Sequence, residues 1–331
     1  MPTPAIGAGT TRPANAGAAA ASMTSPNARF SIRDMCPLSF VKLLHAKLIN
    51  DNITAVGCHQ GDYSLQIVAI LDVALIVVFV LLAWAEFVAA RGRKAVAEPA
   101  DARLATNFGL GIMVLLLMSL APAAKVSAAF IAQSQFDGLA EHFAWPWLPT
   151  LAVFVVADSF ASYWTHRVMH AVPALWRIHR IHHADSAVDV STSLRNHPLE
   201  LLVTLPVSIA LIVVIGAPPT VVIASQTIMF AASMWQHADI NPPWAERVLG
   251  NWLITPATHR LHHSPDRATH DGNYGDLITL WDRLFGTFSR SGGRGRVGLD
   301  GQVARPDHLL EQILSPVYSP KRGRSSLDLS A

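Results

Sequence analysis

Histidine is the residue type with the greatest chemical potential in this sequence. Of 15 histidines, 11 lie between His166 and His270. Most of them belong to three short motifs, HRVMH, HRIHH and HRLHH, and the second and third are nearly the same pentapeptide. Imidazole is the commonest side-chain ligand of metal ions. The repeated motif therefore points to metal binding.

The spacing within each motif allows neighbouring rings to share an ion. On a helix, residues three or four apart lie on one face, with Cβ atoms about 5–6 Å apart. His166 and His170 can therefore hold one metal together, and so can His179 with His182 or His183. Adjacent His182 and His183 point about 100° apart on a helix. One of them can face a first ion and its neighbour a second.

The number of imidazoles exceeds what one ion takes. A zinc site usually has about four protein ligands, and often about three in catalysis. We therefore predict two metal ions, with the two pentapeptides as half-sites of one dinuclear centre. We predict nine ligands: His166, His170, His179, His182, His183, His237, His259, His262 and His263. Except for His237, each of them is also predicted to be catalytic.

Histidines outside the three motifs carry weaker signals. His197 precedes Pro198, which disfavours an interior helical position, so it is a ligand, a support for a ligand or a turn residue. His270 is a further candidate ligand. Single histidines are most often structural or solvated, and for these we predict no metal role: His45, His59, His142 and His308.

The composition predicts an integral membrane protein. Hydrophobic residues make up 51% and charged residues 15% of the chain, whereas soluble domains are about a quarter charged. The mean hydropathy is +0.33. A net charge of +2 gives no case for nucleic-acid binding. The two cysteines, Cys36 and Cys58, are too few for a disulfide framework and are expected to be free thiols.

Four apolar segments are long enough to position the histidines from within a membrane, since about 20 residues span a bilayer. They cover residues 65–90, 104–124, 147–164 and 201–235. The last is interrupted by GAPP, which predicts a tight helical hairpin, either two short or tilted spans or a re-entrant pair. The expected fold is an all-α integral membrane protein with four to five transmembrane helices.

Basic residues predict the orientation of these spans. RGRKAVAEPADAR follows the first span, and another basic segment follows the third. The positive-inside rule places both in the cytoplasm. Because His166 follows the third span and His237 follows the hairpin, the motifs converge on that face. We thus expect a cytoplasmic helical region that carries the dinuclear site.

The predicted domain organisation has four parts. Residues 1–36 form a disordered N-terminal tail, and residues 37–135 form a membrane region with two spans. Within it, residues 37–50 predict either an amphipathic surface helix or a plain solvated one. The catalytic domain covers residues 136–290, and residues 291–331 form a flexible C-terminal tail. The N-terminal end has no apolar h-region, so no cleaved signal peptide is expected.

The histidine motifs and their surroundings resemble a known family. DSFASYWTHRVMH, LWRIHRIHHAD, RNHPLE and HRLHHSPDRATHDGNYGDLITLWDRLFGTF are similar to the fatty acid hydroxylase and sterol desaturase superfamily of membrane-bound di-iron oxidases, over about residues 147–290. The resemblance implies two iron ions as cofactors, O2 as cosubstrate, and the same nine histidines as ligands. Such enzymes insert oxygen into, or desaturate, an unactivated C–H position of a lipid.

One position departs from the family pattern. Members often carry Asn two residues after the histidine that corresponds to His237, where this chain has Asp239, followed later by Asn241. An aspartate there would bind iron or orient His237. Asp158, about two helical turns before His166, is expected to support the metal helix, because carboxylates inside a membrane are costly and usually functional.

Other carboxylates near the motifs are candidates to hold the second ring nitrogen of a ligand, the alternative being a solvated or capping role. The candidates are Asp185, Asp266, Asp271 and Asp276.

The spacing of the motifs does not separate hydroxylation from desaturation. The resemblance favours hydroxylation of a polar membrane lipid, with desaturation as the alternative at the same centre. Fatty acyl chains, sterols and aminolipids such as ornithine lipids all remain open as substrates. Electrons must come from a separate ferredoxin, cytochrome or reductase, and the expected location is a bacterial inner membrane.

Three other classes of metal protein fit less well. A metal transporter, the remote alternative, would place its ligands near the midplane of its spans. A zinc hydrolase would need a motif such as His-Glu-x-x-His, which is absent from the sequence. A haem protein would need only one or two ligands.

Overall fold

The computed structural model describes residues 61–91, 100–118, 121–240, 242–290, 295–299 and 307–317. By its contacts the chain divides into two units, Met1–Gly61 and Asp62–Ala331, and the second contains nearly all of the described residues. Within the described residues the regular structure is helical, apart from one isolated bridge between Leu253 and Ile278. The expected N-terminal tail, the segment 37–50, Cys36, Cys58 and Asn241 lie outside the described residues.

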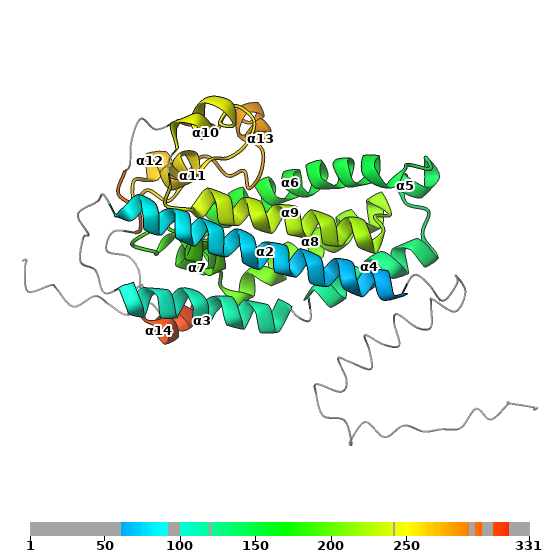
Figure 1. The fold of residues 1–331 in the computed structure, drawn as a ribbon, viewed down its shortest axis with the longest axis horizontal. Coiled ribbons are helices and arrows are strands. Elements are labelled where there is room, and N and C mark those ends of the chain that lie inside the picture. Colours follow the sequence, from blue (N-terminus) through cyan, green and yellow to red (C-terminus); the bar gives the residue numbers. More distant parts are fainter. Residues whose placement is uncertain are drawn as a thin grey trace, which may run out of the picture. The chain divides into compact units, whose positions relative to one another are not determined.

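Long helices form the body of this unit (Figure 1). Helix α6 packs against α8 and α9, and α4 packs against α8 and α9. Their apolar core includes Phe154 of α6, Ile212 of α8 and Val221 of α9, all at most 3% exposed. The long helices are α2 (Gly61–Ala90), α3 (Ala100–Met118), α4 (Ala121–Gln135), α6 (Trp147–Ala171), α8 (Leu201–Ile215) and α9 (Pro219–His237).

Two of the described helical segments are long and apolar enough to cross a membrane. They are Ile70–Ala90 in α2 and Pro198–Ile215, which ends with α8. The apolar side chains of α2 are largely exposed, for example Ile76 at 63% and Leu81 at 58%. A helix surrounded by exposed apolar side chains suits a lipid environment better than water.

The predicted span over residues 104–124 falls on two described helices. Helix α3 is described to Met118 and α4 from Ala121, and residues 119 and 120 between them lie outside the described residues.

The predicted break at GAPP is present. Helix α8 ends at Ile215, and Gly216 caps it in the left-handed conformation with φ +68°. Glycine adopts this conformation without a steric penalty. Helix α9 then begins with Pro219 at its first position, which suits the fixed φ of proline.

Short helices complete the unit. They comprise α5 (Leu139–His142), α7 (Pro173–His183), η2 (Val190–Leu194), η3 (Pro198–Glu200), α10 (Pro243–Val248), α11 (Pro256–His262), α12 (Arg267–His270), α13 (Leu280–Leu284) and α14 (Leu309–Leu314).

The C-terminal region differs from the expected flexible tail over residues 307–317. There α14 packs against α3, and Gln312 is fully buried. The guanidinium of Arg180 donates to the carbonyl oxygen of Ser315 at 2.8 Å. The apolar pattern LLEQIL is too short to stand alone as a helix in water, and tertiary contacts stabilise it.

Candidate metal centre

The elements that carry the three motifs meet at one end of the bundle (Figure 1). HRVMH forms the last turns of α6, HRIHH ends α7, and HRLHH lies on α11. Val172 is extended and Pro173 starts α7, so the chain turns sharply between the first two motifs. Thr255 is the N-cap of α11, and its side chain accepts the N–H of Thr258.

The nine predicted ligands separate into two groups of buried side chains. Within each group, one ring nitrogen from every member lies within 4.8 Å of the others. We call them the first group (His166, His170, His179, His183 and His262) and the second group (His182, His237, His259 and His263). The groups adjoin, because the rings of His183 and His263 stack with centroids 4.6 Å apart.

Each pentapeptide contributes to both groups. His179 and His183 lie in the first group, whereas His182 between them lies in the second. In HRLHH, His262 lies in the first group and its neighbour His263 in the second. This division follows from the helical rotation of about 100° per residue.

Backbone carbonyl oxygens fix the tautomers of four rings. The Nδ1 atoms of His166 and His262 lie 2.9 and 2.7 Å from the carbonyl oxygens of Tyr274 and Gly272. A carbonyl oxygen only accepts, so each Nδ1 carries the proton. In the same way, the Nδ1 atoms of His182 and His237 donate to Arg195 and Ser233. The Nε2 atom of each neutral ring is then a bare lone pair.

These lone pairs point at one another. The Nε2 atoms of His262 and His166 are 3.0 Å apart, and those of His237 and His182 are also 3.0 Å apart. Two acceptors at this distance repel unless a cation lies between or beside them. Metal coordination satisfies both, because neutral imidazole nitrogen binds Zn, Cu, Fe and Ni.

Several other ring nitrogens of the groups are buried without a hydrogen-bond partner. They include Nε2 of His170 and both ring nitrogens of His183. A buried polar atom without a partner costs about 1–3 kcal/mol. The residues present therefore fit metal ions, which would remove this cost.

Burial also sets the charge of the rings. Desolvation lowers the pKa of His166 and of His237 to about 4. It lowers the pKa of His170, His183 and His263 well below the usual value, aided by neighbouring histidines. At neutral pH these rings are uncharged, which is the form that binds metal.

Two carboxylates lie beside ligand rings. Asp271 Oδ1 is 3.4 Å from Nδ1 of His170, as the sequence predicted for one of its carboxylate candidates. Glu200 Oε1 is 3.4 Å from Nδ1 of His179 without forming a hydrogen bond. Sequence reasoning missed Glu200, although it lies in the quoted RNHPLE segment. Asp276 lies farther away, with Oδ1 3.9 Å from Nδ1 of His166.

Three predicted supporting aspartates have polar partners other than the histidine rings. Asp185 is fully buried and pairs with Arg103 at 3.1 Å. Asp239 pairs with Arg260 at 2.5 Å and is absent from both groups. Asp158 accepts a hydrogen bond from Ser225, which joins α6 to α9. These carboxylates pair with side chains that are distant in the sequence, so the sequence alone could not identify their partners.

Asp266 also serves the backbone. It immediately precedes α12 and accepts the N–H of Ala268 in the first turn of that helix. Asp266 therefore has a capping role, the alternative to holding the second ring nitrogen of a ligand.

The two remaining histidine candidates have different surroundings. His197 accepts the N–H of Leu199 and caps η3, and its other nitrogen lies 3.1 Å from the carbonyl oxygen of Ile313. It is therefore a turn residue. His270 forms a third cluster with His170 and Asp271.

Tyr274 was missed by sequence reasoning. Its ring centroid lies 5.1 Å from that of His170 and 5.7 Å from that of His262. Its carbonyl oxygen accepts from His166. Backbone acceptors of this kind leave no signal in a sequence, because every residue has a carbonyl oxygen.

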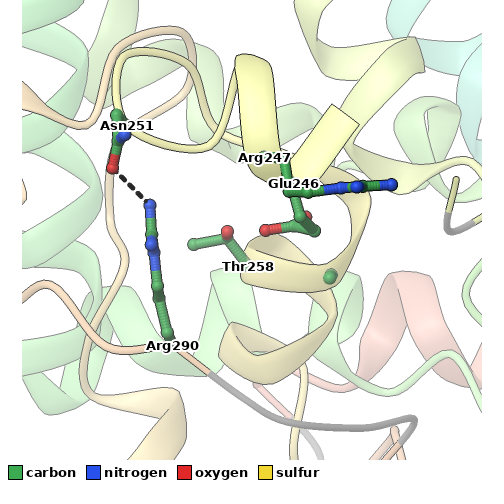
Figure 2. Close-up of a pocket in the computed structure, with 6 residues that line it drawn as sticks. Glu246, Arg247, Asn251, Thr258 and Arg290 are labelled. Carbon is green, nitrogen blue, oxygen red and sulfur yellow. Dashed lines mark hydrogen bonds between the residues drawn. The ribbon is translucent and has the colours of Figure 1, made fainter. Parts of the chain in front are cut away.

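A polar depression of about 410 Å³ lies outside the two groups. Glu246, Asn251, Thr258 and Arg290 are among its lining residues, and none of the nine histidines is (Figure 2). The guanidinium of Arg290 donates to Asn251 Oδ1 at 2.7 Å, shown as the dashed line.

Comparison with known proteins agrees with this geometry. Residues 151–287 match the family model described as fatty acid hydroxylase. Alkylglycerol monooxygenase of Homo sapiens is 32% identical over 146 residues, or 44% of this chain and 31% of that protein. Ornithine lipid hydroxylase OlsE of Rhizobium tropici is 27% identical over 185 residues, or 55% and 54%. No solved structure matches this chain.

A desaturase is also similar. The putative Delta(7)-sterol-C5(6)-desaturase 2 of Arabidopsis thaliana is 29% identical over 155 residues, covering 44% of this chain and 51% of that protein. The chain thus spans about half or less of these relatives. They are named as a monooxygenase, a hydroxylase and a desaturase, all of which are oxidoreductases. All nine histidines lie within residues 151–287, the segment that matches the fatty acid hydroxylase family model.

Proposed function

We propose that this chain is an O2-dependent membrane-lipid hydroxylase with two iron ions, one held by each histidine group. The observation that carries the proposal is the pair of facing Nε2 lone pairs, His166 with His262 and His182 with His237. Neutral rings at this separation need a cation, and two adjoining groups need two. The names of the relatives supply the reaction class.

The protein's own contribution is to fix and desolvate the ligands. Carbonyl acceptors at Tyr274 and Gly272 keep the proton on Nδ1 and so aim Nε2 at the ion. Asp271 beside His170 can strengthen that ligand by accepting a hydrogen bond from its Nδ1–H. Iron bound here would supply the redox chemistry that activates O2 toward an unactivated C–H bond.

The membrane placement is part of the same proposal. Four to five spans would put the histidine end of the bundle on the cytoplasmic face of a bacterial inner membrane. The two candidate spans, Ile70–Ala90 in α2 and Pro198–Ile215, support this placement, as do the basic loops of the sequence. Electrons would come from a separate ferredoxin, cytochrome or reductase.

The proposed substrate is a membrane lipid: a fatty acyl chain, a sterol or an aminolipid such as ornithine lipid. The names of the alkylglycerol and ornithine lipid relatives favour hydroxylation. The similarity to a sterol desaturase favours the second candidate, desaturation at the same centre.

Lipid mass spectrometry tests the proposal. The chain would be expressed in a bacterial host with a ferredoxin and its reductase, and total lipids compared with those of a His262→Ala/His263→Ala variant. A lipid that gains one oxygen atom only with the intact groups supports hydroxylation. A lipid that loses two hydrogen atoms supports desaturation.

The matched control is His142→Ala, because His142 is exposed and belongs to neither group. It should leave the lipid product unchanged. Iron analysis of the purified proteins accompanies the lipid data. Zinc in place of iron in the active preparation would contradict the proposed cofactor.

A further inference from the structure

An exposed apolar face lies on α10, α13 and the segment between Leu249 and Ile254. It consists of Trp244, Val248, Trp252, Leu280 and Leu284, which are 50–75% exposed. Backbone hydrogen bonds join its parts, from Thr279 N to Trp252 O and from Ile254 N to Leu277 O, both 2.9 Å. Figure 1 draws α10 and α13 at the same end of the bundle as α11. Contiguous exposed apolar residues mark an interaction surface.

Helix α13 is fixed against α6 within the proposed third span. Trp281 donates from Nε1 to Ser159 Oγ at 2.9 Å, and its ring lies 4.9 Å from that of Phe160. Phe285 lies 5.1 Å from Trp164, the last residue of that span. Ser159 is five residues inside this end, or about 7 Å at 1.5 Å per residue. Helix α13 therefore lies at the depth of the membrane interface.

The outer side of α13 is apolar as well. Leu280 and Leu284 are 50% and 65% exposed. They are four residues apart and so share one side of the helix. Trp281 and Phe285, each one position further on, face α6.

Helix α10 makes a similar contact with a different span. The ring of Trp244 lies 6.5 Å from that of Trp235, the last residue of the proposed hairpin. Indole side chains favour the level of lipid headgroups. Two independent contacts, one with α6 and one with α9, place the exposed face at the same boundary.

Arginines border the face. Arg247 precedes Val248, and Arg283 precedes Leu284; both are exposed. Arg290 donates to Gly250 O and Asn251 Oδ1, next to Trp252 (Figure 2). Arginines beside apolar and aromatic side chains suit the phosphates of an anionic lipid surface.

We propose that this face is a membrane-contact surface, by which α10 and α13 lie in the anionic cytoplasmic leaflet beside α6. The proposal rests on the proposed membrane placement of α6 and α9. It anchors the α10–α13 region, and with it the segment from α11 to Tyr274, to the membrane that holds the lipid substrate.

Spin-label accessibility tests the contact without requiring activity or metal. The full chain, with Cys36 and Cys58 replaced by serine, would be reconstituted in nanodiscs of phosphatidylcholine and phosphatidylglycerol. Labels at Leu284→Cys and Trp252→Cys would be compared with two references. Val80→Cys on α2 represents lipid, and Ala268→Cys, at an exposed position of α12, represents water.

The expected ratio of oxygen to nickel-chelate accessibility at positions 284 and 252 is several-fold above that at 268 and close to that at 80. A ratio equal to that at 268 would mean that the face meets water, and would overturn the proposal. Low accessibility to both reagents would mean that a protein, such as a second copy of this chain, covers the face, and would also overturn it. A protein that fails to hydroxylate lipids can still give the expected ratio, so the two proposals fail separately.

Discussion

The carboxylate of Glu86 accepts the backbone N–H of Asp239 at 2.6 Å, although the two residues are 153 positions apart. The same oxygen accepts the N–H of Val190 at 2.8 Å. A single side chain of the peripheral helix α2 thus joins the start of η2 to the segment that follows His237. Removing the Glu86 side chain should make the second histidine group less rigid, because the segment that follows His237 loses this contact.

Glu86→Ala is expected to lower the free energy of unfolding by about 1–3 kcal/mol, because it removes two hydrogen bonds that each contribute about 0.5–1.5 kcal/mol. Glu86→Gln keeps an acceptor oxygen and should cost about half as much. Thermal unfolding in detergent measures both. Asp72→Ala, an exposed carboxylate on the same helix, is the control and should have no effect; equal losses at both positions would refute the anchoring role.

The two histidine groups should lose metal separately. His182→Ala with His237→Ala removes two of the four ligands of the second group and leaves all five of the first. We expect about one iron per chain in place of two, because metal sites with about four ligands do not survive the loss of half of them. Metal analysis of the purified variant gives the ratio. His308→Ala serves as the control, and an unchanged ratio in the double variant would contradict the division into groups.

The metal-free protein should become less stable as the pH falls. The pKa of His237 is about 4 in the folded chain and about 6.5 when unfolded. Below pH 6.5 the unfolded state binds the proton more readily, so stability is lost as the pH falls from about 6.5 toward 4 and is constant above that range. One such group contributes about 3 kcal/mol over the full range.

The measurement is the thermal midpoint of metal-free protein at pH 7.5, 6 and 5. The midpoint should be flat above pH 6.5 and decline below it. In the His182→Ala/His237→Ala variant the decline should be shallower, because fewer buried rings remain to be protonated. A midpoint independent of pH in both proteins would argue against buried neutral histidines.

Gly216 should tolerate substitution less well than Gly286, although both have a left-handed backbone, with φ +68° and +70°. A Cβ at position 216 would lie 2.8 Å from the Cα of Gly138, whereas nothing lies within 4 Å of one at position 286. Gly286→Ala should cost about 1–2 kcal/mol for the conformation alone. Gly216→Ala should add about 1–3 kcal/mol of overpacking.

Thermal unfolding of the two variants compares the sites directly. Equal losses would mean that the turn between α8 and α9 relaxes away from Gly138.

The sequence by itself determined the helical character, the apolar segments, the break at GAPP and the nine histidines. These depend on local spacing: three- and four-residue steps place rings on one helical face, and neighbours rotate by about 100°. The division of HRIHH into His179 and His183 against His182 follows the same rule. The ligand roles themselves stay a prediction.

Only the tertiary structure decided which partner each polar group takes. Asp185 pairs with Arg103, and Asp239 pairs with Arg260. A backbone carbonyl oxygen accepts the hydrogen bond from the ring of His182. Long-range packing also places Glu200 beside His179. It stabilises α14 as a helix in a region that the sequence predicts to be a flexible tail. The physical reason is that buried charges and hydrogen-bond donors must find partners wherever the fold brings them, and sequence separation says nothing about that distance.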